Sequence, residues 1–179
     1  MSWILSFVLF AFGVYIVYNT ISMVLFGVPH SLSMTYYLFK EQGFKLRYLF
    51  PALIVTMVVC LMPGWIEISE GSTYQFTAFL SAAGLAFVGA APAFRDCKIE
   101  NKVHMVSAAC AAVFALLWCC VVCYQIAWII VPLSLIVVWA TAFITKTHKT
   151  AATYWWEMVA FLATFVTIIT ECIILMQIN

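Results

Sequence analysis

The sequence is short of charge. Only 8% of its 179 residues are Asp, Glu, Lys or Arg, whereas a soluble domain usually carries about 25%. So few charged side chains cannot cover a water-facing surface, which excludes an ordinary soluble domain. The charges also nearly cancel, because eight Lys and Arg stand against seven Asp and Glu. Without a basic surface the chain lacks the feature that nucleic-acid binding requires, and no nucleic-acid partner is expected.

Apolar residues are abundant instead. They make up 66% of the chain, and aromatic residues make up 17%. Disordered chains are polar and poor in aromatic residues, so this composition also excludes disorder. The class that remains is an integral membrane protein, and the length of the chain suggests a single domain.

Six apolar segments are long enough to cross a bilayer. A hydrocarbon core about 30 Å thick needs roughly 20 apolar residues in a helix that rises 1.5 Å per residue. The apolar segments are continuous rather than short and alternating, which favours helices over the strands of a transmembrane barrel. The sequence therefore predicts an all-α, polytopic membrane protein, one domain over residues 1–179, with spans at residues 3–26, 48–65, 74–94, 103–124, 126–145 and 154–176.

The basic residues predict the orientation of this bundle. Short cytoplasmic loops collect Lys and Arg. All eight basic residues fall in three alternate connections or at the helix ends beside them: Lys40, Lys45 and Arg47; Arg95, Lys98 and Lys102; Lys146 and Lys149. We therefore expect these connections in the cytoplasm and both the N-terminus and the C-terminus outside. Trp3, Trp65, Trp118 and Trp128 then lie toward the outer ends, where indole rings favour the headgroup boundary.

Polar residues gather near the predicted cytoplasmic ends of the helices. This candidate cluster consists of His30, Ser33, Arg95, Asp96, His104 and His148. Imidazole and carboxylate are ligands that zinc prefers, so His30, Asp96, His104 and His148 are candidate metal ligands. However, the sequence contains no H-x-x-x-H or H-E-x-x-H pair that would place two ligands on one helical face. Separate histidines at the membrane boundary are the alternative to a zinc site.

Two carboxylates, Glu157 and Glu171, lie within the last predicted span. An ionisable group inside a membrane is costly, and it usually faces the bundle interior or a water-filled space. Both residues are close enough to a helix end to extend toward the headgroups instead. A functional carboxylate and a carboxylate that extends to the surface therefore remain alternatives for each.

Small residues recur at spacings of four in the third and fourth predicted spans. Ala78, Ala82, Ala86 and Ala90 form one row, beside Gly84, and Ser107, Ala111 and Ala115 form another. Small side chains let transmembrane helices approach closely. The pattern predicts a tight contact between these two helices, with a ligand groove or an oligomer contact as the alternative.

Several short motifs occur in an order that resembles a known group of membrane proteins. They are Gly27-Val28-Pro29-His30 leading to Ser31-Leu32-Ser33-Met34-Thr35-Tyr36, then Gly84-Leu85-Ala86-Phe87-Val88-Gly89 leading to Ala91-Pro92-Ala93-Phe94 and Asp96, then Val103-His104 with Ala108 one turn on. This order is similar to an uncharacterised bacterial six-helix membrane family of unknown function, and more distantly to the Frag/DRAM/Sfk group. The resemblance implies a six-helix bundle concerned with lipids or partner proteins, and it nominates Ser33, Pro92 and His104. We expect a multi-pass protein of the bacterial inner (plasma) membrane.

Three functions remain open at this point. The favoured hypothesis is a non-enzymatic protein that binds membrane lipids or a membrane-protein partner through its cytoplasmic face, with no cofactor. The second is a channel or transporter that associates with itself as a homo-oligomer. The third is a metal-dependent lipid hydrolase or transferase at the cytoplasmic membrane face, with zinc held by the histidine cluster.

Overall fold

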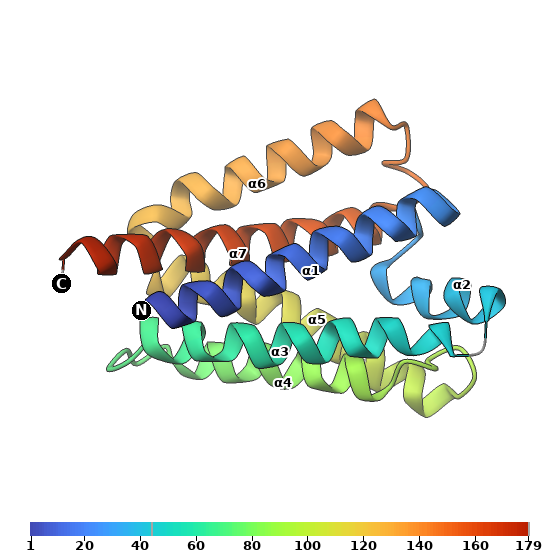
Figure 1. Cartoon of the computed structure of the whole chain (residues 1–179), viewed down its shortest axis with the longest axis horizontal. Helices are drawn as coiled ribbons and strands as arrows, with labels where there is room; N and C mark the ends of the chain where they lie inside the picture. The colour runs from blue at the N-terminus through green and yellow to red at the C-terminus, as the bar shows by residue number, and fades with distance from the viewer. Residues whose placement is uncertain (44, 179) are drawn as a thin grey trace.

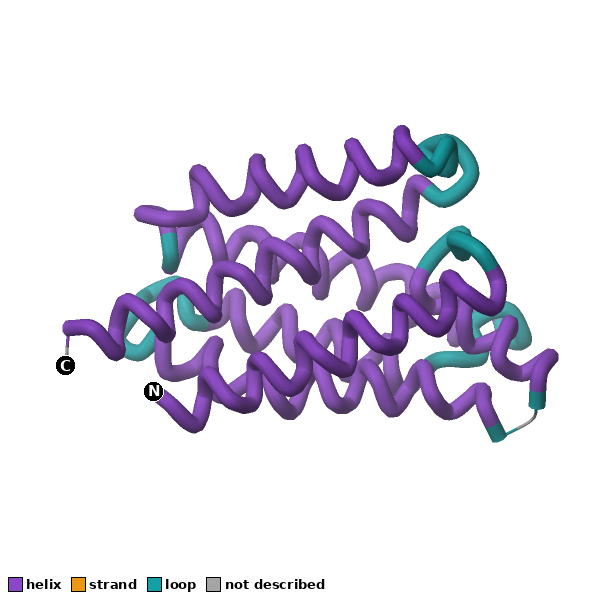
Figure 2. Tube along the Cα trace, turned by 45° about the horizontal axis from the view of Figure 1, so that its top comes forward, coloured by secondary structure: helices purple, strands orange, loops and turns teal. Residues whose placement is uncertain are grey.

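The structure is a computed structural model that describes residues 1–43 and 45–178, and these residues form helices without any strand. The long helices run along the long axis of the molecule: α1 (Ser2–Phe26), α3 (Leu49–Ile68), α4 (Phe76–Ala90), α5 (Lys98–Val122), α6 (Tyr124–Ile144) and α7 (Ala152–Ile178) (Figure 1). The short elements η1 (Leu32–Met34), α2 (Thr35–Gln42) and η2 (Leu46–Tyr48) join α1 to α3. The connections gather at the two ends of the bundle (Figure 2). The predicted all-α class is confirmed.

Five helices are long and apolar enough to cross a membrane: α1, α3 together with η2, α5, α6 and α7. They correspond to five of the six predicted spans, and the protein is a multi-pass helical membrane protein. The largest shift of a single boundary among these five is at the start of α5, which begins at Lys98 rather than at residue 103. Its first turns carry Lys98, Glu100 and Lys102, so the helix extends beyond the apolar segment that defined the prediction.

The third predicted span, residues 74–94, is helical only over the 15 residues of α4. This length corresponds to about 22 Å, which is less than the hydrocarbon thickness. The helix stops at Ala91 (φ −116°, ψ 57°), because a residue before proline is disfavoured in the helical conformation. The helix α4 nevertheless lies beside α3, and both termini lie at the same end of the bundle (Figure 1). The sixth crossing stays a prediction.

The contact between α4 and α5 is very close, as the small-residue pattern predicted. A Cβ atom added to Gly84 would lie 2.7 Å from both the backbone nitrogen of Ala111 and the carbonyl oxygen of Ser107. The hydroxyl of Ser81 donates a hydrogen bond of 3.0 Å to the carbonyl of Ala111. The two helices therefore touch through their backbones, which forms one side of the bundle interior.

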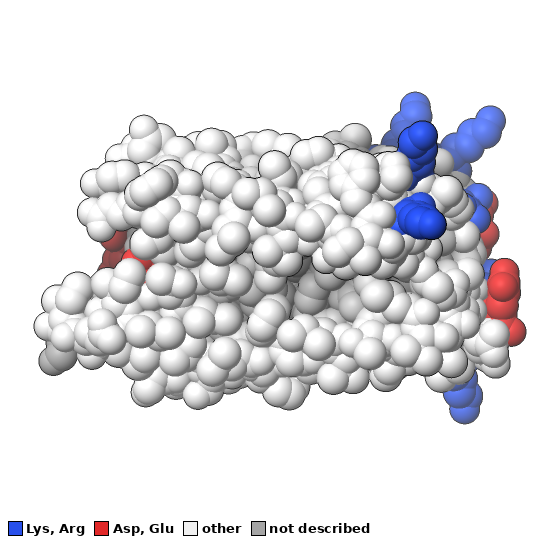
Figure 3. Space-filling model, turned by 90° about the horizontal axis from the view of Figure 1, so that it is seen from above, with Lys and Arg blue, Asp and Glu red and all other residues white. Residues whose placement is uncertain are grey.

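Charge is concentrated at the ends of the molecule, and Lys and Arg gather at one of them (Figure 3). We call this the basic end. It contains η1, α2 and the connections from α4 to α5 and from α6 to α7. The orientation of this end relative to the membrane stays a prediction.

Candidate functional site

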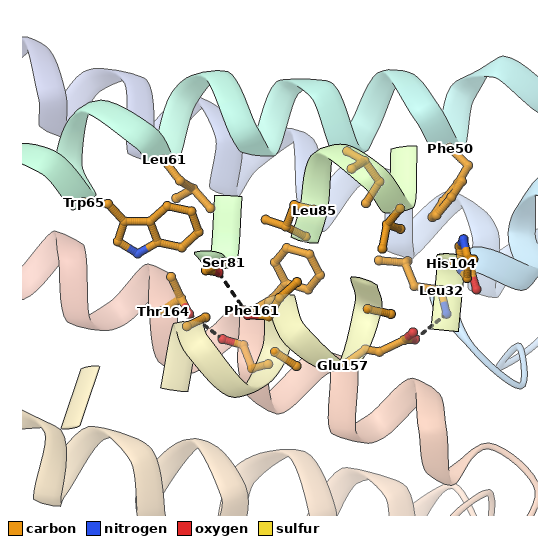
Figure 4. A pocket seen from close by; sticks show the side chains of 18 residues that line it. Leu32, Phe50, Leu61, Trp65, Ser81, Leu85, His104, Glu157, Phe161 and Thr164 are labelled. Atoms are coloured by element: carbon orange, nitrogen blue, oxygen red, sulfur yellow. Dashed lines mark hydrogen bonds between the residues drawn. The ribbon is translucent and has the colours of Figure 1, made fainter. Parts of the chain in front are cut away.

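A narrow cavity runs inside the bundle between α3, α4, α5 and α7, and its lining is shown in Figure 4. Along α3 it extends from Phe50 to Trp65, which corresponds to about 22 Å at the helical rise. The space open to the centres of water-sized molecules is only about 60 Å³. A long, narrow shape of this kind suits a slender chain.

The cavity exists because α5 presents alanines where larger side chains would fill the interior. Ala108, Ala112 and Ala115 line it on α5, and Ala160 lines it on α7. In contrast, Ser107 lies where α4 makes its closest approach. The small residues of this span therefore serve two purposes, a tight helix contact and an open cavity, although the sequence analysis favoured only the first.

The ionisable lining residues lie at the end of the cavity nearer the basic end. Glu157 of α7 and His104 of α5 line it there, together with Leu32 and Ser33 of η1 (Figure 4). Towards the other end, the hydroxyl of Ser81 donates to the carbonyl of Ala111, and the hydroxyl of Thr164 donates to the carbonyl of Ala160. The cavity is therefore mainly apolar, with its acid and its imidazole at one end.

Glu157 holds η1 against the bundle. Its carboxylate oxygen Oε2 accepts a hydrogen bond of 2.6 Å from the backbone N–H of Leu32. Within the described part of the chain, the other carboxylate oxygen, Oε1, has no hydrogen-bond partner. One oxygen thus has a structural contact, and the other is available to a bound molecule.

His104 is fixed by the irregular end of α4. The side chain is 2% exposed, and its Nδ1 lies 2.9 Å from the carbonyl oxygen of Ala91. A carbonyl only accepts, so Nδ1 is the donor in this pair. The ring also stacks on Phe94, with 4.5 Å between ring centroids. His104 therefore connects the start of α5 to the end of α4, which Pro92 terminates, while its ring lines the cavity.

Ser33 and His104 do not form a nucleophile and base pair. The Ser33 hydroxyl lies 3.1 Å from that of Ser31, and the described contacts of His104 include no hydrogen bond to Ser33. The three side chains Ser33, His104 and Glu157 surround one space, and this geometry is suited to binding.

The other two histidines have separate partners. His30 Nδ1 lies 2.5 Å from the carbonyl oxygen of Thr150, and the His30 carbonyl accepts from Tyr154 N at 3.1 Å. His148 stacks on Phe143 with 4.4 Å between ring centroids. Among the described residues, no three His, Cys, Asp or Glu side chains lie close enough together to hold a metal ion. The described residues therefore provide no ligand cluster for zinc. The zinc site stays a prediction.

Arg95 and Asp96 lie on the exposed connection between α4 and α5, outside the cavity lining. Asp96 Oδ2 is 3.7 Å from Lys40 Nζ, and the backbone N–H of Arg95 donates to the Tyr37 hydroxyl at 2.7 Å. These contacts attach α2 to this connection. An exposed ion pair of this kind contributes little to stability.

The structure separates the two carboxylates of α7. Glu157 lines the cavity, whereas Glu171 lies beside the Cys123 thiol and is not part of the lining. Their sequence environments were similar, since each is near one end of the same apolar span. Their different positions follow from packing, because only Glu157 meets the η1 turn.

The sequence analysis placed four tryptophans at the headgroup boundary, and two of them are buried inside the bundle. Trp65 is 1% exposed and Trp118 is 0% exposed, and their ring centroids are 6.5 Å apart. Trp3 and Trp128 are exposed as expected. The indole N–H of Trp65 forms no hydrogen bond within the described residues. The Trp65 side chain lines the far end of the cavity.

Comparison with known proteins gives no relative, since no family model, curated protein or solved structure matches the chain. The resemblance inferred from short motifs therefore stays a prediction. Any functional proposal must rest on the geometry of the cavity.

Proposed function

We propose that this protein binds a membrane lipid or a similar amphiphile. The apolar chain would occupy the cavity, and the headgroup would lie beside Glu157, His104 and Ser33. One observation carries the proposal: the cavity is long, narrow and mainly apolar, and its ionisable groups lie at the end nearer the basic end of the bundle. A single-chain amphiphile has the same distribution of polarity.

The dimensions support this occupant. Each leaflet of a bilayer contributes about half of a 30 Å hydrocarbon core. The cavity extends over about 22 Å along α3, so it is long enough for a chain that spans one leaflet. Its polar end lies toward the basic residues, and this supports a headgroup position near the membrane boundary.

Filling the cavity is expected to weaken lipid binding. In the Ala112→Leu variant, the larger side chain enters the space between α5 and α7, and we expect the fraction of protein that carries a bound lipid to fall about tenfold. Native mass spectrometry of protein purified in a mild detergent measures this fraction directly. Wild-type protein without any lipid adduct would overturn the proposal.

The neighbouring residue provides a matched control. Val113 is 60% exposed on the outer face of α5. The Val113→Leu variant adds volume to the same helix but leaves the cavity open, so it should retain the lipid occupancy of the wild type. Equal occupancy in the Ala112→Leu and Val113→Leu variants would place the bound lipid outside the cavity.

We also propose that the basic end faces the cytoplasm and that α4 completes a sixth crossing. Positions 70 and 97 flank α4, and both residues are exposed. In single-cysteine variants, a membrane-impermeant maleimide should label Glu70→Cys in intact cells, and the native Cys97 only after permeabilisation. The reverse pattern would invert the orientation. Labelling of both positions from the same side would show that α4 does not cross.

A further inference from the structure

We propose that the bound molecule carries a hydrogen-bond donor as its headgroup, an amine or a hydroxyl, and that acidic headgroups such as carboxylate or phosphate are rejected. This inference rests on the proposed lipid-binding function and specifies the chemical class of the ligand. Three features of the cavity support it: the free oxygen of Glu157, the composition of the lining and the weak selectivity of the apolar part.

The apolar part of the cavity cannot select a ligand by hydrophobicity. A chain that leaves the bilayer for the cavity exchanges one apolar surrounding for another, since lipid tails are as apolar as the side chains that line the space. Preference for one lipid over another must therefore come from the polar contacts at Glu157 and His104.

Glu157 requires a donor. It lies within a spanning helix, where a carboxylate without polar partners is costly. Leu32 N–H satisfies Oε2, but Oε1 has no partner among the described residues. An ammonium or hydroxyl group in the cavity would donate to Oε1, and a hydrogen bond to an ionised acceptor is stronger than one between neutral groups.

The neighbouring groups do not reverse this preference. His104 uses Nδ1 to donate to Ala91, so in the neutral ring Nε2 is an acceptor. The Ser33 hydroxyl can either donate or accept. Among the described residues that line the cavity there is neither Lys nor Arg. When Glu157 is ionised, an acidic headgroup would thus meet a carboxylate at close range without a cation among the lining residues to offset the repulsion.

Three probes with the same alkyl chain test the headgroup directly. Dodecylamine, dodecanol and dodecanoic acid are titrated into the wild-type protein in a neutral detergent, and binding is measured by native mass spectrometry. We expect the amine and the alcohol to bind, and the acid to bind at least about tenfold more weakly. Equal or tighter binding of the acid would overturn the inference, while the lipid-binding proposal would stand.

Two variants assign the preference to one carboxylate. Glu157→Gln keeps an acceptor oxygen but removes the charge, so amine binding should weaken about tenfold while alcohol binding is retained. Glu171→Gln makes the same change on the same helix outside the lining, and it should keep the wild-type order of the probes. An unchanged amine preference in Glu157→Gln would overturn the role of Glu157.

The failure of the general proposal is distinguishable from the failure of this inference. If the Ala112→Leu variant binds all three probes as the wild type does, the cavity is not the binding site and both proposals fail. If Ala112→Leu weakens binding about tenfold but the acid binds the wild-type protein as tightly as the amine, only the headgroup assignment fails. The probe series on wild-type protein decides the headgroup question even if Glu157→Gln does not fold.

Discussion

Replacement of Gly84 by alanine should destabilise the protein by about 3 kcal/mol, the upper part of the usual range for an overpacked interior. The added Cβ would lie 2.7 Å from backbone atoms of Ser107 and Ala111. A flexible side chain could rotate away from such a clash, but two helix backbones can only move apart. Separation of α4 and α5 would also lengthen the hydrogen bond from Ser81 to Ala111. Thermal unfolding in detergent should show a clearly lower midpoint.

Gly13 supplies the control for this experiment. It lies within α1, and an added Cβ there would meet no atom within 4 Å. Alanine favours a helix over glycine by up to about 1 kcal/mol, so Gly13→Ala should leave the midpoint unchanged or raise it slightly. If Gly13→Ala and Gly84→Ala unfolded at the same temperature, α4 and α5 would not be in backbone contact.

Replacement of Asn19 by leucine should cost about 2 kcal/mol, because it leaves a buried hydroxyl without a partner. Asn19 Nδ2 donates to the carbonyl of Tyr15 at 2.8 Å, and Asn19 Oδ1 accepts from the Tyr154 hydroxyl at 2.8 Å. Both Asn19 and Tyr154 are buried. The pair joins α1 to α7 close to the residues that position η1. The midpoint of thermal unfolding in detergent measures this loss of stability.

A second substitution separates the lost hydrogen bond from a change in shape. Removing both polar partners can be nearly neutral, whereas removing one leaves the other unsatisfied. The double variant Asn19→Leu, Tyr154→Phe should therefore be more stable than Asn19→Leu alone. A double variant that is less stable than the single one would show that the introduced leucine side chain disturbs packing instead.

The helices could be predicted from sequence because hydropathy and helix length are local properties. Residues 126–145 and 154–176 correspond closely to α6 and α7. The prediction was too long at residues 74–94, where the proline at position 92 ends α4 although the apolar run continues. At Lys98 it was too short, because a helix can continue into water where hydropathy falls.

The candidate site was accessible from sequence only in parts. Glu157, Ser33 and His104 were each identified, since a carboxylate within an apolar span and polar residues at helix ends are visible along the chain. Their convergence depends on η1 folding against α7 through Leu32, which no spacing rule encodes. The histidines were grouped by membrane depth alone, and depth does not distinguish His104 in the cavity from His30 and His148 elsewhere.

The backbone contact at Gly84 has a mechanical consequence for the cavity. The α4 and α5 helices have no layer of side chains between them at this point that could rearrange, so this wall is stiff. On the opposite wall, α7 contributes the longer side chain of Phe161, whereas Glu157 is fixed by its hydrogen bond to Leu32. A molecule that enters the bundle would therefore be accommodated by adjustment of side chains on the α7 side, such as Phe161, while the α4–α5 half keeps its shape.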